Sequence, residues 1–245
     1  MKTRNAVLVV LALSNALLGA TPAQDGSAAL IARVEAPQTP NRQGWDPYSL
    51  QQLMERFGVP GMSLAIIKGG QIDVARAYGR ADVTAGSPVT TETAFQAASI
   101  SKPVTAFAVM RLVEAGKLSL DEDINRYLKS WKVPDNEFTR GRPVTLRALL
   151  SHTSGTGDGF GFPGYHPSAE RPTLVQLLNG EKPSNVGRVV WERPPFTAFK
   201  YSGGGTVVVQ LLLTDTLGKP FHELMRELVL DPVGMTNSTT AMAAP

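Results

Sequence analysis

The stretch "AFQAASISKPVTAFAVMRLVEAG", residues Ala94–Gly116, places Ser99 three residues before Lys102 and then continues into a long apolar segment. Side chains three residues apart on a helix share one face, so the Lys102 amine can reach the Ser99 hydroxyl. A serine hydroxyl is a weak nucleophile until a base removes its proton, and a neutral lysine can act as that base. Pro103 suits the first turn of a helix, where its missing N–H costs nothing. One hypothesis for this stretch is therefore an activated serine at the start of a helix.

Ser99 also has a plainer interpretation, because serine is a favoured residue at the N-cap of a helix. A serine three residues before a lysine is weak evidence on its own, since both residue types are common. The pair alone leaves both interpretations of Ser99 open.

The composition indicates a globular chain with no thiol chemistry. The chain has 245 residues, of which 42% are hydrophobic and 18% are charged, enough for one large domain or two small ones. It contains no cysteine, which excludes disulfides and thiolate catalysis. Residues 1–23 carry two cations and no anions, so the remainder has 22 Lys and Arg against 21 Asp and Glu, a net charge of +1. Without a basic cluster, no nucleic-acid partner is expected.

The N-terminal residues have the order of a secretory signal peptide. Lys2 and Arg4 precede an apolar run over residues 6–20, and small residues follow. The run is shorter than the roughly 20 residues of a membrane-spanning helix, so no stable membrane span is expected; an uncleaved N-terminal anchor is the alternative. We expect residues 1–23 to be a signal peptide, the protein to be exported to the periplasm or medium, and residues 24–44 to form a flexible lead-in.

The remaining residues, 45–245, predict an α+β domain. Asp46–Gly58 has helical spacing, and two strands flank Gly69 and Gly70, which predicts a hairpin with a tight turn. Val104–Ala115 is apolar almost all round, which predicts a buried helix. Further helices are expected over residues 123–131, 144–153, 173–180, 206–218 and 220–230, with a long loop over residues 155–172.

This order of elements predicts an antiparallel sheet flanked by helices, together with a separate helical region. A two-strand hairpin is only marginally stable alone, so either the sheet has further strands that these patterns do not reveal or it is incomplete.

Five phrases of the sequence, taken together, resemble the serine β-lactamase-related family. They are, in order, "VPGMSLAIIKGGQ", "FQAASISKPVTA", "LLSHTSG", "YSGGG" and "ELVLDPVGM". The resemblance is to the class C β-lactamase-like branch, which includes D-alanyl-D-alanine carboxypeptidases, D-aminopeptidases and esterases, and it covers Leu50 to Thr239. It implies a β-lactamase/transpeptidase-like fold.

The resemblance also implies a role for each matching residue. Ser99 would be the acylated nucleophile, Lys102 would help to deprotonate it, and Tyr201 would be a base or proton shuttle. A nearby ammonium group lowers the pKa of a tyrosine, which makes this role chemically reasonable. Taken alone, Tyr201 could equally be a loop tyrosine packed on a glycine turn. Gly203 stands where family members often have an asparagine that contacts the substrate amide, so it is a weak substrate-binding position and favours a small ester or an unusual amide.

One motif of the family is missing. Its third motif, K-T-G or H-x-G, has no match after Tyr201. Lys68-Gly69-Gly70 matches the letters but lies in the expected hairpin turn, so no role is transferred to Lys68. Relatives continue beyond the position of Pro245 into strands that complete the sheet and supply one N–H of the oxyanion hole. The sequence is therefore expected to be truncated at its C-terminus.

The histidines do not predict a metal site. His152, His166 and His222 are scattered without ligand spacing, and neither a metal nor an organic cofactor is expected. His152 in "LLSHTSG" is expected to order its own loop rather than to act as a base. The glycine pattern at Gly159–Gly164 lacks the flanking strand and helix of a dinucleotide site.

The sequence therefore predicts an exported serine hydrolase with an acyl-enzyme mechanism. Its partner would be a small-molecule ester, an amide or a peptidoglycan-like substrate. The alternatives are a catalytically silent binding protein and an inactive fragment of the same fold. The oligomeric state is not specified by the sequence.

Overall fold

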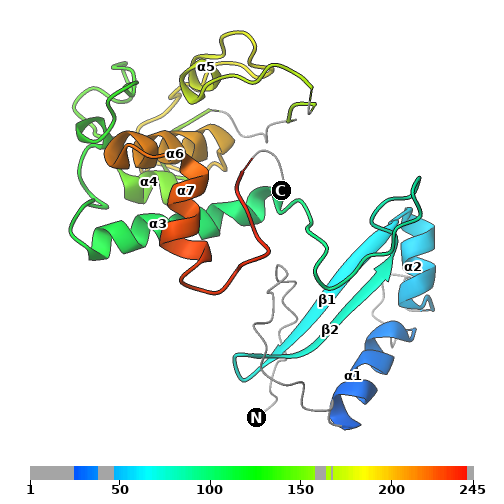
Figure 1. Cartoon of the computed structure of the whole chain (residues 1–245). Coiled ribbons are helices and arrows are strands. Elements are labelled where there is room, and N and C mark those ends of the chain that lie inside the picture. The colour runs from blue at the N-terminus through cyan, green and yellow to red at the C-terminus, as the bar shows by residue number, and fades with distance from the viewer. Residues whose placement is uncertain (1–24, 38–46, 158–163, 167, 242–245) are drawn as a thin grey trace. The chain divides into compact units, whose positions relative to one another are not determined.

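The computed structural model describes residues 25–37, 47–157, 164–166 and 168–241 (Figure 1). The chain divides into two compact units. The hairpin unit comprises Met1–Ala97 with Gly234–Ser238, and the helical unit comprises Ala98–Val233 with Thr239–Pro245. The expected signal peptide lies outside the described residues, and within those residues no helix has the length and apolar character needed to cross a membrane.

The hairpin unit contains the predicted pair of strands. β1 (Gly61–Lys68) and β2 (Gln71–Gly79) are antiparallel, and their register is irregular between Ile66 and Ile67. Gly69 and Gly70 join them with φ angles of 58° and 77°, the left-handed conformation that a two-residue hairpin turn requires. Within the described residues the sheet consists of these two strands, drawn in cyan in Figure 1.

Helix α2 (Leu50–Phe57) lies within the predicted range Asp46–Gly58 and is capped at both ends. The Ser49 hydroxyl accepts a hydrogen bond from the Gln52 N–H, and the Gln52 side chain accepts one from the Ser49 N–H. These reciprocal bonds form a capping box. Gly58 ends the helix in the left-handed conformation.

The expectation of a loose lead-in is wrong for part of residues 24–44, because helix α1 covers Asp25–Glu35. The helix buries Ile31 and contacts β2. The Tyr78 hydroxyl donates a 2.9 Å hydrogen bond to the Glu35 carboxylate. Burial and then this hydrogen bond raise the pKa of Tyr78 to about 12. Tertiary packing thus stabilises a helix that the polar and proline-containing flanks obscured.

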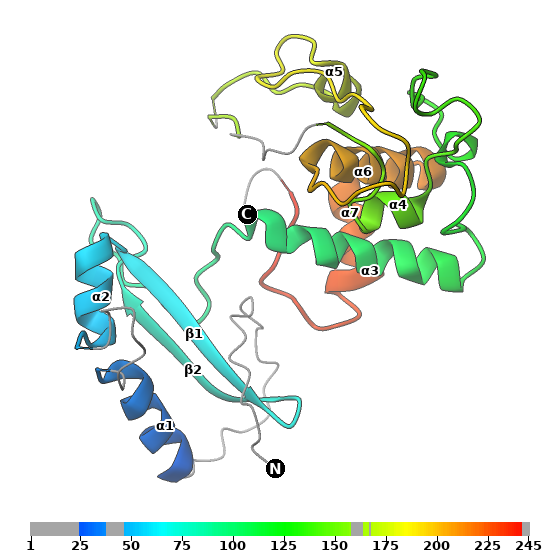
Figure 2. The same cartoon turned by 180° about the vertical axis from the view of Figure 1, so that it is seen from behind.

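The helical unit is built around α6. Its elements are the 3-10 turn η1 (Ala98–Ile100), α3 (Ser101–Glu114), the 3-10 turn η2 (Ile124–Arg126), α4 (Leu146–Leu150), α5 (Leu174–Asn179), α6 (Gly203–Leu217), α7 (Phe221–Met225) and the π turn η3 (Arg226–Leu230). α6 contacts α3, α4, α5 and α7. Figures 1 and 2 show it from opposite sides, next to α4 and α7.

Helix α6 is apolar on nearly all sides because its neighbours surround it. Val208, Leu212 and Leu213 are fully buried. Three consecutive valines precede its leucines, yet the segment is helical as predicted, since burial outweighs the modest helix penalty of β-branched residues.

The prediction that α3 is buried all round is wrong. Ala108 and Val109 are fully buried, but the side chains of Phe107 and Met110 are 64% and 45% exposed. α6, α7 and η3 pack on the buried face of α3. Composition alone did not show which side of the helix these neighbours cover.

The predicted helix over residues 123–131 is also wrong, since only η2 forms there. The Asp123 carboxylate accepts a hydrogen bond from the Asn125 N–H. The Asn125 side chain accepts from the Val133 N–H at 2.8 Å and donates to the Val133 carbonyl at 3.3 Å. Short polar side chains that bond the backbone compete with helix formation, and here they hold a loop.

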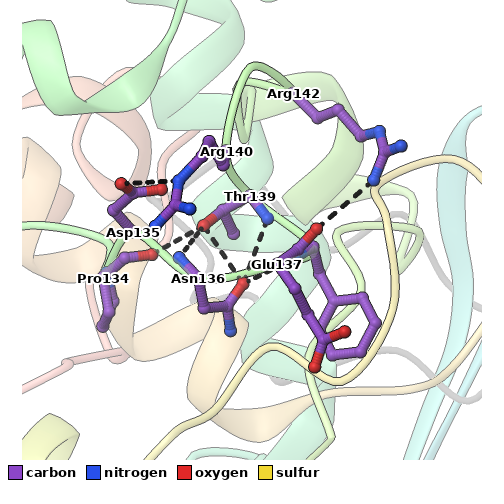
Figure 3. A network of polar contacts seen from close by, with 8 residues as sticks. Pro134, Asp135, Asn136, Glu137, Thr139, Arg140 and Arg142 are labelled. Atoms are coloured by element: carbon purple, nitrogen blue, oxygen red, sulfur yellow. Dashed lines mark hydrogen bonds and ion pairs between the residues drawn. The ribbon is translucent and has the colours of Figure 1, made fainter.

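A second asparagine orders the loop that leads to α4 (Figure 3). The Asn136 side-chain oxygen accepts hydrogen bonds from the N–H groups of Phe138 and Thr139 at 2.9 and 3.1 Å. Its amide nitrogen donates to the Trp191 carbonyl at 3.0 Å. Trp191 in turn pairs with Thr156. The loop is thereby connected to the segment that follows α4.

Candidate active site

The segment that enters α3 presents Ser99 outside the helix. Ala98 has a φ of 45°, a left-handed conformation that few residues other than glycine adopt. The N-cap of α3 is Ile100, and no side chain caps it. The interpretation of Ser99 as the N-cap is therefore wrong, and its exposed side chain stands on the 3-10 turn before the helix.

Lys102 lies next to Ser99, as the spacing predicts. Its ammonium nitrogen Nζ donates a hydrogen bond of 3.1 Å to Ser99 Oγ. The Lys102 side chain is half-buried, whereas the Ser99 side chain is exposed to solvent. The pair therefore combines an accessible hydroxyl with a positioned amine.

Tyr201 joins this pair from a distant part of the sequence. Lys102 Nζ lies 4.7 Å from the centroid of the Tyr201 ring. Hydrogen bonding with Lys102, and then with Ser99, lowers the pKa of the Tyr201 phenol below its ordinary value, although partial burial opposes the shift. The structure thus brings together the three side chains that the sequence singled out.

The residues after Tyr201 begin α6. The buried Ser202 hydroxyl accepts a 2.7 Å hydrogen bond from the Gly205 N–H and caps the helix. Gly203 is the first helical residue and is buried. Because glycine has no side chain, the position offers a substrate no amide group.

His152 contacts the Tyr201 segment, which the sequence did not reveal. Its carbonyl accepts a 2.8 Å hydrogen bond from the Lys200 N–H, and its ring nitrogen Nδ1 accepts one of 3.2 Å from the Ser202 N–H. Its ring centroid lies 4.6 Å from that of Tyr201. The sequence predicted a role for His152 only in its own loop; these partners lie about fifty positions away.

Gly155, the glycine of "LLSHTSG", allows the backbone of residues 153–155 to approach that of residues 192–196 closely. The Gly155 carbonyl accepts a hydrogen bond from the Glu192 N–H, and the Thr153 carbonyl accepts one from the Phe196 N–H. Gly155 has a φ of 88°, and a Cβ there would lie 2.1 Å from the Arg193 carbonyl oxygen. Only glycine fits this position without displacing the backbone.

The described residues offer no cluster of three or more His, Asp or Glu side chains for a metal ion. Lys68, whose neighbours match the letters of the third motif, ends β1 at the hairpin turn. The candidate site combines the exposed hydroxyl of Ser99, the amine of Lys102 and the phenol of Tyr201, whose pKa is lowered. Such a set can remove a serine proton and support nucleophilic attack on a carbonyl.

Ser99, Lys102 and Tyr201 thus form a candidate serine–lysine–tyrosine site. The family model described as "Beta-lactamase" matches residues 49–245. The chain therefore belongs to the β-lactamase family, as the motifs predicted.

Individual relatives agree with this placement. The chain is 31% identical to "Esterase EstB" of Burkholderia gladioli over 80% of its own length and 50% of the esterase. It is 30% identical to "Penicillin-binding protein 4" of Amycolatopsis lactamdurans over 79% and 50% of the two chains. It thus spans about half the length of these relatives.

A solved structure confirms the fold class. The structure of "EstCE1, a hydrolase with promiscuous acyltransferase activity" matches with a TM-score of 0.68 and 26% identity, over 86% of this chain and 53% of that one. The predicted β-lactamase/transpeptidase-like architecture is thereby confirmed.

Proposed function

We propose that the protein is a serine hydrolase that cleaves a small ester through an acyl-enzyme. The observation that carries the proposal is the 3.1 Å contact between Lys102 Nζ and Ser99 Oγ, beside a tyrosine whose pKa is lowered. Ser99 is the nucleophile, the Tyr201 phenolate receives its proton, and the Lys102 ammonium stabilises that phenolate.

The reaction has two stages. In the first, Ser99 Oγ bonds to the carbonyl carbon and its proton passes to the Tyr201 oxygen; the bond from the carbonyl carbon to the alcohol oxygen then breaks, and the alcohol leaves with that proton. In the second, water attacks the acyl carbon, gives its proton to Tyr201, and Ser99 Oγ departs and recovers the proton. An alcohol can replace water, which would transfer the acyl group.

Three observations support an ester over a peptide or a penicillin as the substrate. Gly203 provides no amide side chain to contact a substrate amide. Two of the similar proteins are described as an esterase and as a hydrolase with acyltransferase activity. An ester also needs less leaving-group activation than an amide, which suits a site in which one phenol moves the protons.

The test is the intact mass of the full chain after brief exposure to p-nitrophenyl butyrate, to a D-alanyl-D-alanine peptide or to benzylpenicillin. We expect a butyryl adduct on Ser99 with release of p-nitrophenol, and much slower reaction with the other two reagents. Ser99→Ala should abolish the adduct, and Ser101→Ala, which alters the neighbouring serine, should retain it. Folded protein that reacts with none of the three reagents would favour a silent binding protein or an inactive fragment.

We further propose that residues 1–23 direct export and are removed. Lys2, Arg4 and the apolar run after them support this proposal. The N-terminal peptide of the protein recovered from the periplasm or medium should begin near residue 24. An intact Met1 on exported material would contradict cleavage.

A further inference from the structure

We infer that His152 is a positioning residue that holds Tyr201 at the Ser99–Lys102 pair; the catalytic part of this inference rests on the proposed function. The roles proposed for Ser99, Lys102 and Tyr201 do not themselves require a histidine at position 152. The inference comes from the way one residue contacts three consecutive residues of a distant segment. Those residues are Lys200, Tyr201 and Ser202.

The backbone of His152 makes the first contact. α4 ends just before it, and His152 adopts a φ of 56°, which turns the chain sharply. In this conformation its carbonyl accepts the 2.8 Å hydrogen bond from the Lys200 N–H. The residue before Tyr201 is thereby attached to the end of α4, whose Leu146 and Leu149 lie in the core.

The imidazole makes the second contact, on the other side of Tyr201. Nδ1 accepts a 3.2 Å hydrogen bond from the Ser202 N–H. A ring nitrogen that accepts carries no proton, so the contact requires the neutral tautomer with its proton on Nε2. Ser202 also caps α6, so this bond fixes the point at which the helix begins.

The face of the imidazole makes the third contact. Its centroid lies 4.6 Å from that of Tyr201, with the planes inclined by 37°. The Phe199 ring meets the imidazole edge-on, at 5.9 Å and 83°. Because the backbone is held on both sides of Tyr201 and the ring is supported on one face, the phenol has little freedom to move away from Lys102.

Displacement of the phenol would have a measurable consequence. The neighbouring Lys102 and Ser99 keep the pKa of Tyr201 below its ordinary value. If Tyr201 moves away from them, its pKa rises and less phenolate is present at neutral pH. A displacement of about 1 Å at a catalytic group can also lower a rate by about a hundredfold.

The experiment uses the full chain labelled with tyrosine carrying 13C at Cζ. The chain has five tyrosines, and Tyr201→Phe identifies the signal of Tyr201. We expect the Tyr201 signal to titrate below the ordinary tyrosine range in the native protein and at clearly higher pH in His152→Ala. His152→Asn should retain the lower value, because the asparagine oxygen can accept from the Ser202 N–H and asparagine tolerates positive φ. His222→Ala, a change on α7, is the matched histidine control and should leave the titration unaltered.

A second readout follows acylation of Ser99 by p-nitrophenyl butyrate. We expect His152→Ala to slow it by about ten- to a hundredfold, and to change it by less than about threefold when Tyr201 is already phenylalanine. His152→Asn should recover most of the rate.

Two results would overturn the inference. One is a Tyr201 titration in folded His152→Ala that matches the native protein; the other is an equal loss in His152→Asn and His152→Ala. The titration needs no turnover, so a protein that fails to form an acyl-enzyme would contradict the proposed function and still report on the position of Tyr201.

Discussion

The two units of the chain differ most in what they bury. Among the described residues of the hairpin unit, the buried apolar side chains are Ile31, Met54, Val74 and Val89, and none of them is fully buried. The helical unit buries a continuous core centred on α6, together with parts of α3, α4, α5 and α7. Ser99, Lys102, Tyr201 and His152 all belong to the helical unit. The geometry of the candidate site is therefore determined by the larger core, and the hairpin unit is expected to tolerate change with less effect on it.

The largest expected effect is on the acylation of Ser99, and it distinguishes two lysines. Lys102 belongs to the serine–lysine pair, whereas Lys68 only matches the third motif in sequence. Lys102→Ala removes the group that contacts Ser99 and Tyr201, and we expect acylation of Ser99 to fall by about 10² to 10⁴. Lys68→Ala, in the hairpin unit, should leave the rate within about twofold, since its side chain is exposed. Stopped-flow release of p-nitrophenol measures both rates. A large loss in Lys68→Ala would show that the hairpin unit supplies a site residue.

Substitutions that shorten a buried side chain should lower the unfolding free energy of the two units by different amounts. Leu212 of α6 is fully buried, whereas Met54 of α2 is 7% exposed in the smaller core. We expect Leu212→Ala to cost about 4 kcal/mol of unfolding free energy and Met54→Ala about 2 kcal/mol. Leu212→Ala should also reduce acylation at moderate urea concentrations, whereas Met54→Ala should not. Equal loss of activity in the two variants would mean that the units unfold together.

Two glycines with similar constraints provide a matched pair. A Cβ on Gly155 would lie 2.1 Å from the Arg193 carbonyl oxygen, and one on Gly79 would lie 2.1 Å from that of Pro60. Both have positive φ, so each alanine substitution should destabilise its own unit by about 1–3 kcal/mol. Only Gly155→Ala should slow acylation, because Gly155 lies in the segment that includes His152. Hydrogen exchange of the two units, measured beside the acylation rate, tests this difference.

The smallest expected effects come from two ionisable groups that act at opposite ends of the pH range. Burial and then the hydrogen bond with Glu35 raise the pKa of Tyr78 to about 12. The contribution of Tyr78 to the stability of the hairpin unit is therefore complete below pH 10 and is lost as the pH rises toward 12. Burial of Asp215 opposes its ionisation, but hydrogen bonds from Lys129 and Ser130 outweigh this and lower its pKa, so its contribution to the helical unit is lost as the pH falls through that value.

Substitution of Asp215 or Tyr78 should remove the corresponding dependence of stability on pH. Asp215→Asn is expected to cost the helical unit about 1–2 kcal/mol at pH 7, and Tyr78→Phe about 1 kcal/mol in the hairpin unit. Urea unfolding followed by hydrogen exchange at several pH values distinguishes the units. A hairpin unit of Tyr78→Phe that still loses stability above pH 10 to the native extent would contradict the assignment.

The sequence predicted contacts between neighbours better than contacts across the chain. Ser99 and Lys102 are close in sequence, so helical geometry was enough to pair them. Tyr201 was reached through its motif, since no periodicity connects it with Lys102. The position of His152 against Ser202 depends on how α4 and α6 pack, which local patterns do not encode. The same limit explains the missed helix α1 and the exposed face of α3, because both depend on which neighbours cover an element.

The most direct test of Ser99 as the activated nucleophile is a residue-level map of covalent modification by a fluorophosphonate, which reacts with activated serines. We predict one modified residue, Ser99, among the chain's serines, with labelling that falls at least about a hundredfold in Lys102→Ala and stays near the native rate in Lys68→Ala. Slow labelling spread over several serines, or labelling of Ser99 that does not depend on Lys102, would contradict it.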